Sequence, residues 1–210
     1  REGLAQALAN IGRASTLPAI TALNDEARVD GALLALSYLP VHEYSNEIKV
    51  FATKKIESAL YYDDLARKIN PDPSSRSHRP DDFSGGDRLH LLVDSIRAHA
   101  QHAGIQVLQA LSLLNDRENI QVAIDNLQSK ESTQRANALE TLENIHESRL
   151  IRPLLRLWES PDSPPSNSGY AQDVIVKLLR EPDDWLRACA LFAAQDMEDA
   201  KSIFDVARSD

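Results

Sequence analysis

The sequence has little of several features that mark other classes of protein. It contains one cysteine, Cys189, which excludes an internal disulfide framework, and the apolar run around Cys189 predicts a small buried side chain. Aromatic residues make up only 5% of the chain, whereas Leu and Ala are abundant, as helices that pack on helices require. No apolar run approaches the roughly 18 to 20 residues that span a bilayer. We therefore expect a helical protein with no membrane insertion in this segment.

The composition also predicts that the protein has no basic surface. The formal net charge is −9, which argues against a nucleic-acid partner because such a partner requires a positive face that offsets phosphate charge. The lysines at 49, 54 and 55 are interleaved with Glu47 and Glu57. This pattern predicts a solvated helix face with helical salt bridges.

The chain does contain internal repeats. Four segments place apolar residues at the same relative positions when Pro18, Val122, Pro153 and Val174 are aligned. These segments are 16–23, 119–127, 149–158 and 173–179. Each predicts the first helix of a pair, with Pro18 and Pro153 in a first helical turn, where proline is tolerated.

Two further segments predict the second helices, residues 131–142 and 182–191. Each carries an arginine, Arg135 or Arg187, eight residues after the last core position of the preceding helix, with Ala and Leu following at helical spacing. Arg28 is a looser third copy. The repeating unit is therefore a helix, a short acidic turn and a second helix, and stacked copies of such a unit form a solenoid.

Between these copies, residues 44–69 and 87–115 predict two long helices that pair with each other. Pro, Ser and Gly between them predict a flexible insertion at 70–87, and a second loop is predicted at 160–169. The expected fold is all-α, an α-solenoid of antiparallel helix pairs that forms one domain over 1–210. Because residue 1 is Arg and both ends fall inside helical pattern, we expect a fragment of a longer protein.

The acidic turn followed by Arg, Ala and Leu resembles the second helix of HEAT repeats, most clearly over 116–194. More narrowly, segments 110–120, 134–145 and 183–192 resemble the HEAT segment of certain bacterial proteins. In those proteins an ATP/ADP-translocase-like or major-facilitator membrane domain precedes the repeats, and a cyclic-nucleotide-binding domain often follows. The resemblance implies a cytoplasmic connector tethered to the inner membrane through other parts of the protein, and it brings no catalytic residue with it.

The histidines are the main candidates for chemistry. His42-Glu43 and His146-Glu147 resemble the pairs of HEAT-repeat di-iron hydroxylases, but that family needs four pairs near helix starts, and here two are expected at helix ends. His99 and His102 have a spacing that can present two ligands to zinc, with Asp94 or His90 on the adjacent surface. Without a convincing third ligand, an exposed helix face is favoured.

Other reactive patterns do not stand out. Gly85-Gly86 lacks the Lys and the preceding strand of a nucleotide-binding loop. We therefore assign no catalytic, cofactor-binding or metal-binding residue and no cofactor. The expected function is a non-catalytic scaffold that binds a protein partner or couples flanking domains. The alternatives are a HEAT-type lyase acting on a protein-bound chromophore and a HEAT-type metal-dependent hydroxylase.

Overall fold

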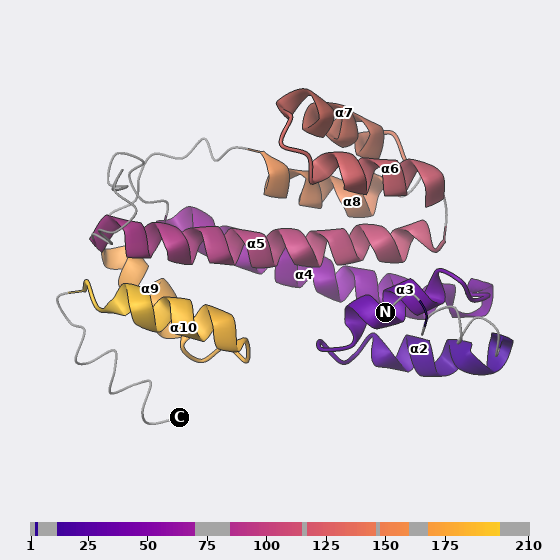
Figure 1. Cartoon of the computed structure of the whole chain (residues 1–210), viewed down its shortest axis with the longest axis horizontal. Coiled ribbons are helices and arrows are strands. Elements are labelled where there is room, and N and C mark those ends of the chain that lie inside the picture. Colours follow the sequence, from indigo (N-terminus) through magenta and orange to yellow (C-terminus); the bar gives the residue numbers. More distant parts are fainter. Residues whose placement is uncertain are drawn as a thin grey trace. The chain divides into compact units, whose positions relative to one another are not determined.

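The structure, a computed structural model, describes residue 3 and residues 12–69, 85–114, 117–145, 148–159 and 168–197. Every regular element in these ranges is a helix, which confirms the predicted all-helical class (Figure 1). Of the two predicted irregular segments, residues 70–84 and 160–167 lie outside the described ranges. Their remaining residues belong to the helices that begin at Gly85 and Ser168.

The helix positions agree closely with those expected from the sequence. The α-helices are α2 (Thr16–Ala22), α3 (Val29–Leu36), α4 (Ser45–Ile69), α5 (Gly85–Ser112), α6 (Arg117–Leu127), α7 (Ser132–Glu143), α8 (Ser148–Leu155), α9 (Ser168–Leu178) and α10 (Asp184–Ala194). Short 3-10 helices are η1 (Gly12–Ser15), η2 (His42–Tyr44) and η4 (Arg156–Trp158). The helical spacing of apolar residues explains the agreement: α6, for example, buries Ile120, Ala123, Ile124 and Leu127 along one stripe.

The prediction for Pro153 is wrong. Pro18 is the third residue of α2 and does lie in a first turn, but α8 begins at Ser148, so Pro153 is inside the helix. A proline at this position has no N–H for the hydrogen bond to the carbonyl four residues earlier. The helix changes to the 3-10 form of η4 within three residues.

The chain divides into two compact units. Unit 1 contains residues 1–60 and 101–159, and unit 2 contains residues 61–100 and 160–210. The long helices α4 and α5 therefore contribute residues to both.

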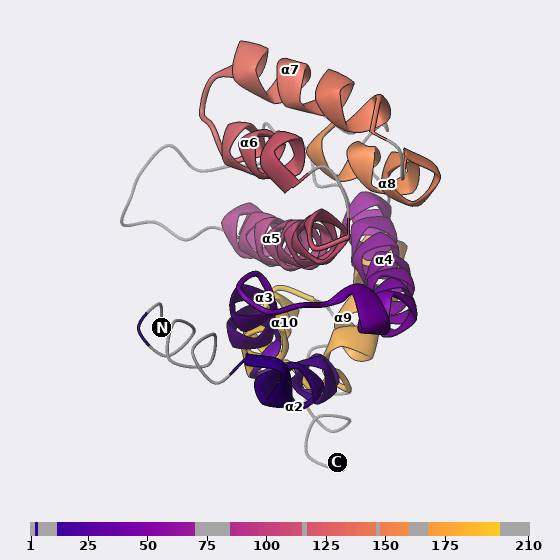
Figure 2. The ribbon, with the colours of Figure 1, turned by 90° about the vertical axis from the view of Figure 1, so that its right-hand side faces the viewer.

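In unit 1, neighbouring helices in the sequence contact each other: α2 with α3, α6 with α7, and α7 with α8. Figure 2 shows α6, α7 and α8 as neighbours, and α2 beside α3. The predicted apolar stripe of α5 is buried here, with Val107, Leu108 and Leu111 fully enclosed. Burial of this stripe is the main source of stability for helices of this length.

Helix α5 approaches η4 closely in unit 1, and Gly104 makes that approach possible. A Cβ atom at Gly104 would lie 2.8 Å from Leu157 Cδ1 and 2.9 Å from Trp158 Cη2. The amide of Gln101 donates to the Leu157 carbonyl at 2.9 Å, one turn before Gly104. Trp158 is half-buried against this glycine.

In unit 2, α9 contacts α10, and both helices carry buried apolar residues. Helix α10 buries one face consisting of Leu186, Cys189, Ala190, Ala193 and Ala194. The Cys189 Sγ atom lies 3.4 Å from Ser95 Oγ of α5. The predicted burial of Cys189 is confirmed, since only 4% of its surface is exposed.

Candidate functional site

The sequence predicted that the first His-Glu pair lies at the end of a helix, and this prediction is wrong. His42 and Glu43 form the 3-10 turn η2 directly before α4. With Thr16, Pro40 and Tyr44 they line a small cavity of about 170 Å³ in unit 1. The placement differs because α3 ends at Leu36, well before this pair. His146 and Glu147 lie outside the described residues.

The two histidines of α5 have separate partners. His99 Nδ1 lies 3.7 Å from Asp183 Oδ2 in unit 2, whereas His102 Nε2 lies 3.5 Å from Asp30 Oδ1 in unit 1. His90 is buried, with 9% of its surface exposed. Among the described residues, no group of three or more His, Cys, Asp or Glu side chains could hold a metal ion.

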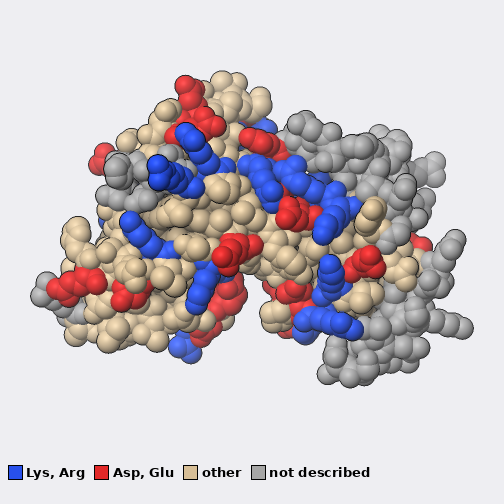
Figure 3. Space-filling model, turned by 180° about the vertical axis from the view of Figure 1, so that it is seen from behind, with Lys and Arg blue, Asp and Glu red and all other residues tan. Residues whose placement is uncertain are grey.

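Lys55 is not part of a solvated face, which corrects the prediction for this residue. Its Nζ atom pairs with Glu26 Oε2 at 2.6 Å, and its side chain is only 12% exposed. Glu26 lies in the turn before α3, so this pair joins two elements of unit 1 instead of two turns of α4. On the face drawn in Figure 3, Lys and Arg side chains are interleaved with Asp and Glu.

A groove in unit 1 has a volume of about 470 Å³. We call it the α3–α5–α6 groove after the helices that supply most of its walls. Its lining residues are Asp30, Leu33, Leu34, Ser37, Tyr38, His102, Ile105, Gln109, Ser112, Leu113, Arg117, Gln121 and Gln128. The lining residues on α3 and on α5 recur at helical spacing, so each of these helices contributes one face to the groove.

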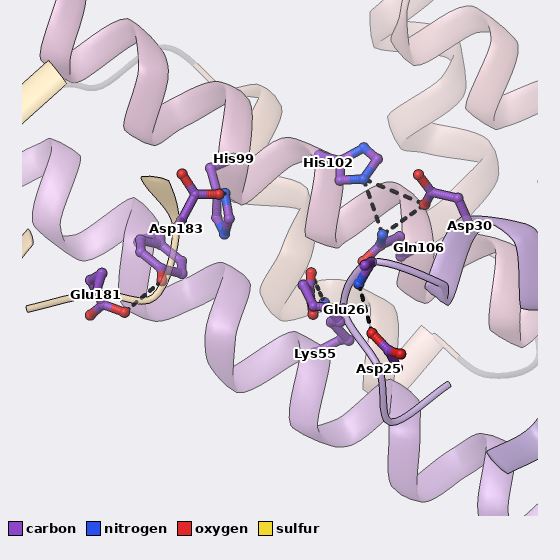
Figure 4. Close-up of polar contacts among 11 residues, drawn as sticks. Asp25, Glu26, Asp30, Lys55, His99, His102, Gln106, Glu181 and Asp183 are labelled. Atoms are coloured by element: carbon purple, nitrogen blue, oxygen red, sulfur yellow. Dashed lines mark hydrogen bonds and ion pairs between the residues drawn. The ribbon is translucent and has the colours of Figure 1, made fainter. Parts of the chain in front are cut away.

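A polar cluster occupies one wall of the groove (Figure 4). Gln106 is buried, and its Nε2 donates to Asp30 Oδ1 at 2.8 Å and lies 3.0 Å from His102 Nε2. An amide nitrogen is only a donor, so His102 Nε2 is the acceptor in this contact. The Asp30 carboxylate lies beside both the side-chain amide and the imidazole ring.

A positive group lines the same groove. Arg117, the first residue of α6, donates from Nη1 to the Ser37 carbonyl at 2.7 Å. Ser37 is the C-cap of α3, and such carbonyls have no partner within their own helix. The guanidinium therefore satisfies a helix end and keeps four further N–H groups.

The floor of the groove is apolar. Leu33 and Ile105 are buried, with 3% and 9% of their surface exposed, and Leu34 and Leu113 are half-buried. Tyr38 also lines the groove and is 46% exposed. Most of the other lining residues are polar or charged, so polar side chains border this apolar part of the groove.

Unit 2 contains a second polar cluster around Glu181, in the turn before α10 (Figure 4). Tyr62 donates to Glu181 Oε2 at 3.0 Å, and Tyr61 donates to Oε1 at 3.2 Å. Burial, and then the charge of Glu181, raise the pKa of both tyrosine hydroxyls well above the usual value. The Tyr62 ring lies edge-on to His99, with centroids 4.4 Å apart. The hydroxyls therefore stay protonated and hold the turn in place.

The two repeated arginines make the same contact in different units. Arg135 Nη1 donates to the Ser129 carbonyl at 2.8 Å, and Arg187 Nη1 donates to the Glu181 carbonyl at 3.2 Å. In both cases the acceptor is six residues earlier, inside the turn that joins two helices. These arginines therefore have a structural role. Arg28 differs, because it pairs with Asp25 at 2.9 Å and is largely exposed.

Trp185 and Tyr170 are the most exposed of the described aromatic side chains of unit 2. Trp185 in the first turn of α10 is 63% exposed, and Tyr170 near the start of α9 is 58% exposed. Gly85 and Gly86 form the first residues of α5.

The chain was compared with proteins of known family, function or structure. No protein-family model, curated protein or solved structure matches it. Searched over its described residues, the chain has no helix that is both long and apolar enough to cross a membrane.

Proposed function

We propose that the chain is an α-solenoid of helix pairs and acts as a non-catalytic scaffold that binds a protein segment in the α3–α5–α6 groove. The observation that carries this proposal is the groove itself, about 470 Å³ in volume with an apolar floor and charged groups of both signs. Its walls are helices, so its shape is set before a partner arrives, which reduces the entropy lost on binding.

The solenoid part of the proposal is supported by the repeated turn. Two helix pairs, α6–α7 and α9–α10, are closed by an arginine that donates to a carbonyl six residues earlier. Recurrence of one contact at the same register is what stacked copies of a helix pair predict. The two helices of each pair are consecutive in the sequence and contact each other.

Peptide selection on the full chain tests the scaffold function. We expect a random octapeptide library to yield peptides that bind the purified protein and lose binding to Leu34→Arg, which places a charge in the groove. Leu17→Arg is the matched control, because Leu17 is 57% exposed and does not line the groove. This control is expected to bind normally.

A second variant protects the test against misfolding. Gln121 is exposed and lines the groove, so Gln121→Trp should fill the groove without disturbing the core. Peptides whose binding is unchanged by both Leu34→Arg and Gln121→Trp, or a selection that yields no binder, would contradict the scaffold proposal. Circular dichroism of each variant confirms that its helices are intact.

We also propose a setting for this scaffold, a cytoplasmic connector between a membrane carrier and a ligand-sensing domain. The support is the resemblance of segments 110–120, 134–145 and 183–192 to the HEAT segment of such bacterial proteins. Sequencing the full gene tests it, with a multi-span membrane domain expected upstream. A gene that encodes this helical segment without membrane spans would contradict the proposed connector role. It would not affect the proposal that the groove binds a protein segment.

A further inference from the structure

The α3–α5–α6 groove contains one carboxylate and one guanidinium at a separation that the helix sets. Asp30 lies in the first turn of α3, and Arg117 is bonded to the carbonyl of Ser37, seven residues further along the same helix. Seven residues of α-helix rise about 10 Å. The negative and positive groups of the groove are therefore about two helical turns apart.

The carboxylate has room for a ligand. Its contacts with Gln106 Nε2 and His102 Nε2 both involve Oδ1 of Asp30. The Asp30 side chain is 45% exposed. Gln106 is an uncharged donor, so its hydrogen bond orients the Asp30 carboxylate and leaves it available to a cation.

Gln106 acts as a positioning residue for this carboxylate. It is 2% exposed, and its Nε2 uses its two N–H groups on Asp30 and His102. Its Oε1 atom is buried without a hydrogen-bond partner. An amide with one unsatisfied atom costs stability. Its presence is better explained by the orientation that it gives to Asp30 at the groove wall.

The space between the two charges fits a peptide in the polyproline II conformation. Such a chain advances about 3.1 Å per residue with three residues per turn, so side chains three residues apart face the same way and lie about 9 Å apart. The apolar floor of Leu33 and Ile105 would contact side chains that point inward. Gln109 and Gln121 offer amide donors and acceptors that match a peptide backbone.

We infer that the groove binds a peptide segment in which a lysine or arginine stands three residues from a carboxylate, the cation on Asp30 and the carboxylate on Arg117. This inference rests on the proposed scaffold function and narrows its partner class. The carboxylate can come from an Asp or Glu side chain or from the end of a peptide chain. Both sources present the same group to the guanidinium.

The test uses the complete 210-residue chain and a library of acetylated, amidated octapeptides. Selected peptides are expected to be enriched in Lys or Arg three residues from Asp or Glu, in either order, because a polyproline II peptide can run in both directions. A parallel library with free C-terminal acids separates the two sources of carboxylate. Preference for a basic residue three positions before a free terminus would assign the chain end.

Substitutions then test whether the peptide cation binds Asp30 and the peptide carboxylate binds Arg117. For the best octapeptide, measured by fluorescence anisotropy, Asp30→Asn and Arg117→Gln are each expected to weaken binding about tenfold. Asp30→Asn should have no further effect on a peptide whose basic residue is replaced by norleucine, and Arg117→Gln none on a peptide whose carboxylate is replaced by an amide. Glu140→Gln is the control, an exposed carboxylate of α7 outside the groove lining.

The outcomes separate the two proposals. Peptides that need the groove but show no preference for a charged pair, or that bind Asp30→Asn and Arg117→Gln as well as the wild type, would overturn the inference and leave the scaffold function intact. A library with no groove-dependent binder would overturn both.

Discussion

The helix pairs α6–α7 of unit 1 and α9–α10 of unit 2 are closed in the same way but buried differently. In both, an arginine donates to a carbonyl six residues earlier, from Arg135 to Ser129 and from Arg187 to Glu181. The equivalent positions are 52 residues apart throughout. The repeated sequence signature therefore encodes the turn between the helices.

The second helices share only two buried positions. Ala138 and Leu142 of α7 correspond to Ala190 and Ala194 of α10, and all four are buried. Three further buried positions of α10 correspond to exposed polar residues in α7. Leu186, Cys189 and Ala193 of α10 align in sequence with Gln134, Asn137 and Thr141 of α7.

Helix α5 explains the extra buried stripe of α10. Within unit 2, Cys189 contacts Ser95, and Arg88 lies over the Phe192 ring, 4.8 Å from its centroid. Arg88 Nη1 also donates to Gln195 Oε1 at 2.9 Å. A shared signature thus specifies how a pair is closed, and the neighbouring helix decides how much of it is covered.

Among substitutions at equivalent positions of the two pairs, the one at Leu186 should give the largest difference in the free energy of unfolding. It is fully buried, so Leu186→Ala is expected to lower the free energy of unfolding by about 2–5 kcal/mol through lost burial and a cavity. Gln134→Ala, at the same register position of α7, should change it by less than about 0.5 kcal/mol. Urea denaturation measures both. Equal losses would show that α7 is buried on this face in solution.

The turn contact should be equally important in both pairs. Arg135→Met and Arg187→Met keep the aliphatic stem but leave the Ser129 or Glu181 carbonyl without its donor. Each is expected to cost about 1–2 kcal/mol, since both arginines are partly exposed. Arg28→Met is the control and should cost less than about 0.5 kcal/mol, because its ion pair is exposed. A loss confined to one pair would break the equivalence of the two turns.

The contribution of the N-cap residue to stability should also differ between α10 and α7, by a smaller amount. The Asp183 side chain accepts a hydrogen bond from the Leu186 N–H at 2.7 Å, whereas Glu131 makes no such bond at the start of α7. Asp183→Ala is therefore expected to lower the unfolding free energy by about 1 kcal/mol, and Glu131→Ala to have almost no effect. Thermal denaturation of both variants tests this. A comparable loss for Glu131→Ala would indicate an N-cap bond in α7 as well.

The smallest expected effect is a loss of stability at alkaline pH. It concerns only the α9–α10 turn. The folded state holds the protons of Tyr61 and Tyr62 at pH values where the unfolded chain releases them, so stability should fall as pH rises above about 10. Glu181→Gln removes the negative charge and should lower both pKa values, though burial keeps them raised. Absorbance of tyrosinate at 295 nm follows the titration.

Ser129→Ala, at the equivalent position of the α6–α7 turn, is the control and should leave the titration unchanged. Single Tyr61→Phe and Tyr62→Phe variants assign the two steps. A titration that Glu181→Gln does not move would mean that the two hydroxyls are not bonded to this carboxylate.

The sequence predicted the helices and the spacing of the repeats because these depend on local periodicity. The arginines were identified by their spacing, although their carbonyl acceptors were not. Pro153 was misplaced because the pattern marks which residues face the core and does not fix the first turn of a helix. Val122 aligned with the repeats but is 58% exposed, since alignment position alone does not determine burial.

The groove could not be predicted from the sequence. Asp30, His102 and Arg117 come from three helices, and their proximity results from tertiary packing. His102 was considered with His99 because they share a helix face, yet each contacts a different carboxylate. Gln106 gave no signal, because a glutamine within an apolar helix resembles any other polar residue until its neighbours are known.

The two tryptophans of the chain provide one optical probe for each unit. Trp158 of unit 1 is half-buried against Gly104, whereas Trp185 of unit 2 is 63% exposed. An indole in water emits at longer wavelength and is quenched more readily by acrylamide than one in an apolar contact. Replacing either tryptophan with phenylalanine leaves a single fluorophore, so melting can be followed in one half of the protein at a time.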